Sequence, residues 1–226
     1  MATRALLADL AAAALAVGAP PLEIESVGGV DAAVRVAAGE QVDLVFLASG
    51  ALSSLARDAH LDASTVTPIA LSQVAVAVPS EGAGPATAPG ATAFRDASGL
   101  RAALRAAERV GYSTGPSGTA LVGMIEEWGF TGELGDRLVQ ARPGVPVAAS
   151  LAVGDVDLGF QQLSELVGQP GIRILGVLPA DCAIDTVFSG AVAAASTDPA
   201  AAAEMLAFFA SKEMRTVLEG HSFTPV

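Results

Sequence analysis

The sequence has few of the residues that build metal clusters and disulfides. Its 226 residues include one cysteine, Cys182, and two histidines, His60 and His221. A single cysteine excludes an internal disulfide and a cysteine-based zinc cluster. Two histidines in segments that look peripheral do not favour a histidine-rich metal site. We therefore predict that Cys182 is a small packed or half-exposed thiol, and we predict no metal site and no cofactor.

Basic residues are also scarce, with 12 Lys and Arg against 24 Asp and Glu, for a formal net charge of −12. Binding to nucleic acid needs a basic face, so this class of partner is not expected. An acidic protein can still bind a small anion where backbone N–H groups at helix starts neutralise it locally. Hydrophobic residues make up 52% of the chain, which is ample for a core.

Long apolar runs are absent too, so the sequence predicts no membrane span. Residues 4–19 superficially resemble a signal peptide, but Asp9 interrupts the apolar run. Apolar residues recur there at helical spacing, which predicts an amphipathic helix of the fold over residues 2–17. The expected apolar face consists of Leu6, Leu10, Ala13, Ala14 and Val17.

Beyond this helix, strand-like and helical segments alternate, which is typical of an α/β fold with parallel sheets and crossover helices. Strands are predicted at 22–26, 42–48, 65–79, 109–113, 137–141, 156–162, 172–178 and 184–195. Helices are predicted at 30–38, 50–59, 97–108 and 120–129, with a short one within 143–154 and one or two over 199–221. Residues 80–93, rich in Gly, Pro and Ala, are predicted to be a loop.

Two predicted loops carry hydroxyls and glycines directly ahead of a helix. The first contains Ser26, Gly28 and Gly29; the second contains Ser113, Thr114, Ser117, Gly118 and Thr119. Glycine permits close backbone approach, hydroxyls donate without charge, and helix starts add a partial positive field. These groups could bind an oxyanion or a carboxylate without Lys or Arg. The alternative is that the hydroxyls serve as helix caps alone.

A third candidate is the amide pair Gln161-Gln162, at the end of the predicted strand 156–162. Ligands of open parallel sheets lie beyond the carboxyl ends of the strands, which is the edge where this pair falls. Adjacent residues of a strand point to opposite faces, so one of the two, taken as Gln161, is expected to face a ligand. The alternative is a solvated strand end.

The segments IESVGG, GEQVDLVFLAS, RVGYSTGPSGT and VDLGFQQLSEL, in this order, resemble molybdate-binding solute receptors with the type II periplasmic-binding fold. The resemblance covers nearly the whole chain. It implies two α/β lobes, residues 1–79 with 181–226 and residues 80–180, and a small anion, such as molybdate or a small carboxylate, bound in the cleft between them. It places Ser26 and its glycines on one lobe, and the second hydroxyl loop and Gln161 on or near the other. It also implies an ABC permease as a partner.

Two departures from the family pattern keep other functions open. Family members normally begin with a strand and a serine loop, whereas this chain starts at the first helix, and no export signal is evident. The protein is therefore expected in the periplasm if its start is truncated, and in the cytoplasm if the chain is complete. Some proteins that resemble this family are isomerases of unsaturated tricarboxylic acids, such as aconitate isomerase. Such an enzyme needs a base and donors that stabilise a charged intermediate.

Three residues are candidates for that base, and each has another interpretation. Tyr112 could be a packing residue, Asp31 a helix-start charge and Glu165 part of a solvated face. A ligand-sensing module without transport or catalysis fits the same residues. The sequence thus favours a solute-binding protein, with an isomerase and a sensor as the alternatives.

Overall fold

The computed structural model describes residues 2–80 and 90–226. The chain divides into two compact units: unit 1 runs to Ser72 and resumes at Thr186, and unit 2 comprises Gln73–Asp185. The first border falls within strand β2 (Thr67–Pro79) and the second at the start of strand β7 (Asp185–Val192). The predicted borders were 79/80, at the end of β2, and 180/181, a few residues ahead of β7. Most of the predicted loop 80–93, namely residues 81–89, lies outside the described residues.

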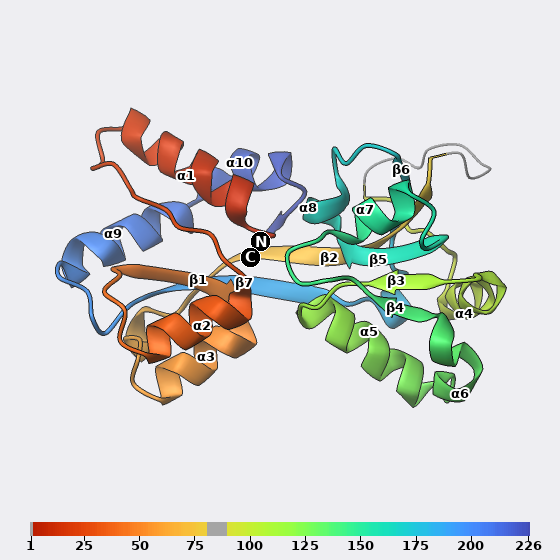
Figure 1. Ribbon diagram of the computed structural model, residues 1–226. Helices are drawn as coiled ribbons and strands as arrows, with labels where there is room; N and C mark the ends of the chain where they lie inside the picture. Colours follow the sequence, from red (N-terminus) through yellow and green to blue (C-terminus); the bar gives the residue numbers. More distant parts are fainter. Residues whose placement is uncertain (1, 81–89) are drawn as a thin grey trace. The chain divides into compact units, whose positions relative to one another are not determined.

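Unit 1 is an α/β layer structure in which helices cover both faces of a small sheet (Figure 1). Its helices are α1 (Arg4–Ala16), α2 (Gly29–Ala37), α3 (Ser49–Arg57), α9 (Pro199–Phe209) and α10 (Arg215–Gly220), with 3₁₀ turns at Ala63–Thr65 and Lys212–Met214. Its strands are β1 (Leu44–Ala48), the first half of β2 (Thr67–Pro79), most of β7 (Asp185–Val192) and β8 (Thr224–Pro225).

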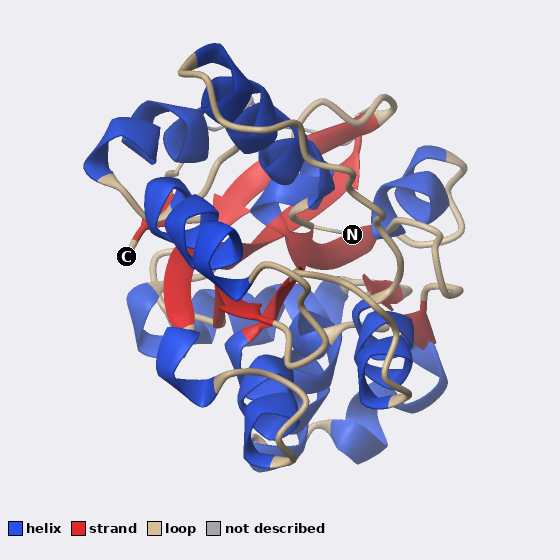
Figure 2. Cartoon of the chain, turned by 90° about the vertical axis from the view of Figure 1, so that its left-hand side faces the viewer, coloured by secondary structure: helices blue, strands red, loops and turns tan. Residues whose placement is uncertain are grey.

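The side chains of β1 explain the two layers of unit 1, because successive residues of a strand point to opposite faces. Leu44 and Phe46 pack against the apolar cluster formed by α1, α9 and α10. Val45 and Leu47 pack against α2 and α3. Figure 2 shows helices on both sides of these strands.

The N-terminal helix is confirmed as a packed part of unit 1. Leu6, Leu10 and Ala14 of the predicted face are buried, and Ala13 is partly buried. Leu7, which the helical spacing missed, is also buried, whereas Val17 is 69% exposed. The prediction for Val17 was wrong because the helix ends at Ala16, so the residue no longer follows the helical spacing.

Unit 2 combines a mixed sheet with helices on both faces. Its helices are α4 (Ala97–Ala106), α5 (Pro116–Glu127), α6 (Thr131–Leu134), α7 (Val147–Ala152) and α8 (Leu163–Leu166), with 3₁₀ turns at Gly135–Arg137 and Ala180–Cys182. Its strands are the second half of β2, β3 (Val110–Tyr112), β4 (Leu138–Gln140), β5 (Leu158–Gln162) and β6 (Ile172–Val177). Strand β3 pairs in parallel with both β4 and β5, and β2 pairs antiparallel with β5 and β6.

Small residues let α7 approach this sheet closely. A Cβ atom on Gly111 of β3 would lie 3.1 Å from a methyl of Val147 in α7, and one on Gly159 of β5 would lie 2.7 Å from a methyl of Leu151 in α7. Ala75 and Ala77 of β2 face the same side, while Val74 and Val76 face α4 and α5 on the other. The face of the sheet that α7 covers is therefore built largely from glycine and alanine, two residue types that are abundant in this sequence.

Three details differ from the sequence-based predictions. Residues 22–26 are not a strand, because no neighbouring strand of the described chain forms a hydrogen-bond ladder with them. Strand β1 was expected in a parallel pair, but it runs antiparallel to β7. Helix α5 begins at Pro116 rather than at Ala120. In the described part of the chain, no helix is both long and apolar enough to cross a membrane.

Candidate functional site

The start of α5 is built around two serines that leave β3. Ser113 follows the last residue of β3, and Gly115 and Pro116 then begin the helix, proline being well suited to the first helical position. This places Ser117 in the first turn, where its Oγ lies 2.9 Å from the Oγ of Ser113. Ser117 is 4% exposed and Ser113 is half-buried.

Gly118 makes this arrangement possible. A Cβ atom at this position would lie 1.8 Å from the carbonyl oxygen of Ser113. Such a contact excludes any side chain, so glycine is required for the helix start to pack against the end of the strand. The close approach fixes the two serine hydroxyls relative to each other.

The serine pair keeps one hydrogen-bond donor for a ligand. Each hydroxyl has one proton to donate, and the bond between Ser113 and Ser117 uses one of the two. One O–H therefore remains for an acceptor outside the pair. The first turn of α5 holds no acidic residue, so the partial positive field of the helix start is not neutralised from within.

The two threonines of this segment are placed differently. Thr114 is exposed. Thr119, predicted in the loop, lies inside α5, and its hydroxyl donates to the carbonyl oxygen of Gly115 at 3.5 Å. The hydroxyl of Thr119 is thus directed toward the backbone of its own helix.

Gln161 lies beside Ser113 at the same sheet edge, because Tyr112 and Phe160 are paired in parallel. Its side chain is buried and is held inside unit 2: the amide oxygen accepts from the N–H of Val147 at 2.8 Å, and the amide nitrogen donates to Glu165 at 3.1 Å. These bonds link α7 and α8 to β5. They show a structural role for the amide; a ligand contact stays a prediction.

The start of α2 in unit 1 is more open. Ser26 is half-buried, while Gly28 and Gly29 are exposed. Asp31 occupies the first turn of α2. Its carboxylate lies beside Gly28, since a Cβ atom on Gly28 would be 3.2 Å from a carboxylate oxygen of Asp31. The helix start therefore already has a negative charge of its own.

The approach to α2 is anchored by charge. Arg35 binds Glu25 with two parallel hydrogen bonds of 2.6 and 2.7 Å and also pairs with Glu40. The hydrogen bonds and the positive charge of Arg35 lower the pKa of both carboxyl groups below their ordinary value. Glu25 precedes Ser26 directly, so this cluster holds the backbone that carries the candidate serine.

A second serine pair, Ser49 and Ser189, was not predicted from the sequence. Ser49 follows β1 directly and begins α3, and its hydroxyl donates to the carbonyl oxygen of Val187 at 2.9 Å while lying 2.6 Å from the Oγ of Ser189. Ser189 must then donate to Ser49, so both protons are used within unit 1. The strand–Ser–Gly–helix order of residues 44–52 is the local signal that could have flagged this pair. Its protons are committed, in contrast to those of Ser113 and Ser117.

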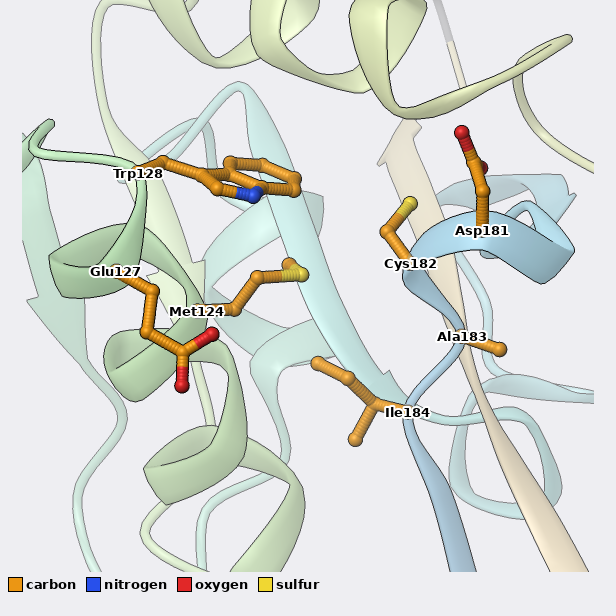
Figure 3. Close-up of a pocket in the computed structure, with 7 residues that line it drawn as sticks. All are labelled: Met124, Glu127, Trp128, Asp181, Cys182, Ala183 and Ile184. Atoms are coloured by element: carbon orange, nitrogen blue, oxygen red, sulfur yellow. The ribbon is translucent and has the colours of Figure 1, made fainter.

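A shallow pocket of about 260 Å³ lies at the other end of α5 (Figure 3). Met124, Trp128, Cys182 and Ile184 are among its lining residues, and no candidate hydroxyl is. Burial raises the pKa of the Cys182 thiol to about 11, so the thiol is protonated at neutral pH and fits the predicted packed cysteine. Among the described residues, no group of three or more His, Cys, Asp or Glu is placed to hold a metal ion.

Comparison with known proteins identifies the family. Residues 1–224 match the family described as bacterial extracellular solute-binding protein. An aconitate isomerase from Pseudomonas sp. is 32% identical over 196 residues, which cover 85% of this chain and 71% of that protein.

Solved structures agree on the fold. The periplasmic molybdate-binding protein of Azotobacter vinelandii superposes with a TM-score of 0.76 at 16% identity, over 98% of this chain and 95% of that one. A tungstate-binding protein from Desulfovibrio alaskensis gives a TM-score of 0.66 at 17% identity, over 98% and 93%. The fold is thus that of type II periplasmic binding proteins. This chain belongs to the bacterial extracellular solute-binding proteins.

Proposed function

We propose that this protein binds a small anion, either a carboxylate or a tetrahedral oxyanion, through neutral hydrogen-bond donors at helix starts. The observation that carries the proposal is the Ser113–Ser117 pair, which has one uncommitted O–H at the start of a twelve-residue helix without an acidic first turn. Ser26, Gly28 and Gly29 at the start of α2, with Thr114, Thr119 and Gln161 in unit 2, are proposed as further ligand-binding residues.

Neutral donors suit this protein for an electrostatic reason. With a formal net charge of −12, long-range attraction does not bring an anion to the molecule. Binding must then come from short-range hydrogen bonds to a charged acceptor, each of which contributes about 1.5–3 kcal/mol. Fixed hydroxyls also lose little conformational entropy when the ligand binds.

A thermal-shift screen tests the proposal, because a ligand that binds only the folded protein raises Tm. The panel is molybdate, tungstate, sulfate, citrate, cis-aconitate and trans-aconitate, each as the same counter-ion salt. We expect at least one anion to raise Tm in the parent and to do so less in Ser117→Ala. Ser98→Ala, an exposed serine of α4, is the matched control and should behave like the parent. No shift with any anion at millimolar concentration would contradict the proposal.

An isomerase of unsaturated tricarboxylic acids is the second candidate, favoured by the 32% identity with an aconitate isomerase. Such a reaction removes a proton from one carbon of an allylic carboxylate and returns one at another, so it needs a positioned base. Of the three candidates, Glu165 is bound by Gln161, and Tyr112 is half-buried against the core of unit 2. Asp31 is exposed and forms no ion pair with described residues, which makes it the first to test.

Proton NMR in D₂O separates the receptor from the isomerase. An isomerase converts trans-aconitate into cis-aconitate and introduces deuterium from the solvent, and Asp31→Asn should abolish this conversion while binding persists. A receptor binds the same compound and leaves its spectrum unchanged over hours. Conversion at the parent rate in Asp31→Asn would exclude Asp31 as the base.

A further inference from the structure

Arg142 follows strand β4, which pairs with β3, the strand that leads to the serine pair of unit 2. Strand β4 runs parallel to β3, and the pairing continues one residue beyond it, because the N–H of Ala141 donates to the carbonyl oxygen of Tyr112 at 2.8 Å. Arg142 therefore leaves the sheet beside the segment that begins with Ser113. Figure 1 shows β3 and β4 side by side, with α5 following β3.

The backbone of Arg142 is fixed by a tight turn. The N–H of Val145 donates to the carbonyl oxygen of Arg142 at 3.0 Å, and Gly144 has a φ of 77°. Proline at the second position and a positive-φ glycine at the third are the residues of a type II turn, here Arg142-Pro143-Gly144-Val145. The sequence RPGV was the signal for this turn. The turn holds the Cα of Arg142 in place while its side chain stays exposed.

The guanidinium of Arg142 has no ion-pair or hydrogen-bond partner among the described residues. Several other arginines are engaged, among them Arg35 by Glu25 and Glu40, Arg105 by Glu133 and Arg137 by backbone carbonyls. Three further arginines of the described chain share the unpaired state of Arg142 but do not follow a strand that pairs with β3, namely Arg4, Arg95 and Arg109. The chain has twice as many acidic as basic residues, so partners are not in short supply. An arginine that is held by its backbone and left unpaired, just beyond the strand beside a serine pair with one uncommitted O–H, is available to an added anion.

We infer that Arg142 determines substrate class: it binds a second carboxylate of a ligand whose first carboxylate is bound at the serine pair, and so selects polycarboxylates. This inference rests on the proposed function and deepens it. A guanidinium binds a carboxylate with two parallel N–H···O bonds, which gives both affinity and a directional requirement. A monocarboxylate or a compact tetrahedral oxyanion satisfies the serine pair but presents no separate second group to Arg142.

Calorimetry on three variants tests the inference, with citrate as polycarboxylate, butyrate as monocarboxylate and molybdate as tetrahedral oxyanion. Arg142→Gln removes the charge. Arg109→Gln is the matched control, since Arg109 is also exposed, borders the same sheet just ahead of β3 and carries the same charge. Arg142→Lys keeps the charge but loses the planar fork.

We expect the Kd for citrate to rise by about tenfold to a hundredfold in Arg142→Gln, the loss of a hydrogen bond to a charged group. The Kd for butyrate or molybdate should change by about twofold at most, as for groups that do not touch. Arg109→Gln should match the parent, and Arg142→Lys should recover part of the loss. This change in the citrate-to-butyrate ratio is a result that a purely structural role of Arg142 does not produce.

Two results overturn the inference while leaving the proposed function intact. One is an unchanged Kd for citrate in Arg142→Gln; the other is an equal loss in Arg109→Gln, which would mean a general effect of charge. A parent protein that binds molybdate but not citrate also rejects the selection of polycarboxylates. If the parent binds none of these three anions and none of the thermal-shift panel, the proposed function fails, and this inference fails with it.

Discussion

The starts of α5 and α2 look alike in sequence but differ in structure. Both combine serine and glycine ahead of a helix. At α5, Ser117 and Gly118 are buried and Gly118 contacts the carbonyl oxygen of Ser113. At α2, both glycines are exposed, and Asp31 places a carboxylate at the helix start.

The two helix starts contain the same residue types, and they differ in how firmly the hydrogen-bond donors are held before a ligand binds. Packing holds the start of α5, and its donors are fixed before a ligand arrives. Ion pairs between Arg35 and two glutamates hold the approach to α2, and its own acid competes for the field of the helix start. We expect the two segments to respond oppositely to the same kind of substitution.

Adding one methyl group should produce the largest contrast. Gly118→Ala forces a Cβ to within 1.8 Å of a backbone oxygen, so we expect a loss of about 3 kcal/mol or more in the free energy of unfolding. Gly29→Ala meets only a methyl of Leu47 at 3.8 Å and should be neutral or gain up to about 1 kcal/mol from helix propensity. Urea denaturation of both variants measures this. Equal stability of the two would refute the packing account of α5.

Removing the acidic residue Asp31 from the start of α2 should have a smaller effect, and it should strengthen anion binding. Asp31→Asn removes a charge that repels an anion at this helix start, so we expect affinity to improve by about 0.3–1 kcal/mol. The same substitution should cost a similar amount of stability, because it loses a favourable charge–helix interaction. Asp58→Asn, at the C-terminal end of α3, removes the same charge elsewhere in unit 1; it should leave affinity unchanged and should raise stability slightly rather than lower it, because a negative charge is unfavourable at that helix end. Titration calorimetry at low salt is the measurement, and weaker binding in Asp31→Asn would reverse this assignment.

Acid should loosen the approach to α2 and spare the start of α5. Arg35 lowers the pKa of Glu25 and Glu40 below 4.5, so the stabilisation from these pairs is complete above that pH and is lost as pH falls through the lowered values. Hydrogen-exchange protection, corrected for intrinsic rates, should therefore drop between pH 6 and pH 3 at residues 32–40, where the N–H groups of Ala32 and Glu40 donate to the carbonyl oxygens of Gly28 and Arg35, more than at residues 118–124 of α5. Arg35→Gln should remove this pH dependence at residues 32–40, whereas Arg57→Gln should not. Equal pH dependence in both segments would argue against charge anchoring.

Much of the fold was predictable because hydrophobic periodicity is local. The helical spacing of Leu6, Leu10 and Ala14 and the apolar run 42–48 predicted α1 and β1. Pairing direction is not local, so β1 was expected in a parallel pair and is antiparallel. Residues 22–26 have strand-like alternation, but a strand also needs a partner, and the described chain provides none.

The site was predictable in its residue types and less so in its contacts. Serine and glycine ahead of a helix indicated the start of α5, and proline at 116 was an unused signal for its true first residue. The local order strand–Ser–Gly–helix could have marked Ser49, but it does not predict the partner Ser189, which lies 140 positions away. Gln161 was expected to face a ligand, yet its amide is bound by Val147 and Glu165, because α7 and α8 both begin beside it.

The most direct test of the central claim is calorimetric titration of molybdate and trans-aconitate into the parent and three variants. Neutral donors at helix starts predict that Ser117→Ala weakens binding of the better ligand by about 1–3 kcal/mol. Ser26→Ala should weaken it less, because that segment is open, and Arg57→Ala in an exposed part of α3 should bind like the parent. If both serine variants bind like the parent and Arg57→Ala binds far more weakly, the anion is held by surface charge, and the account of the serine pair is contradicted.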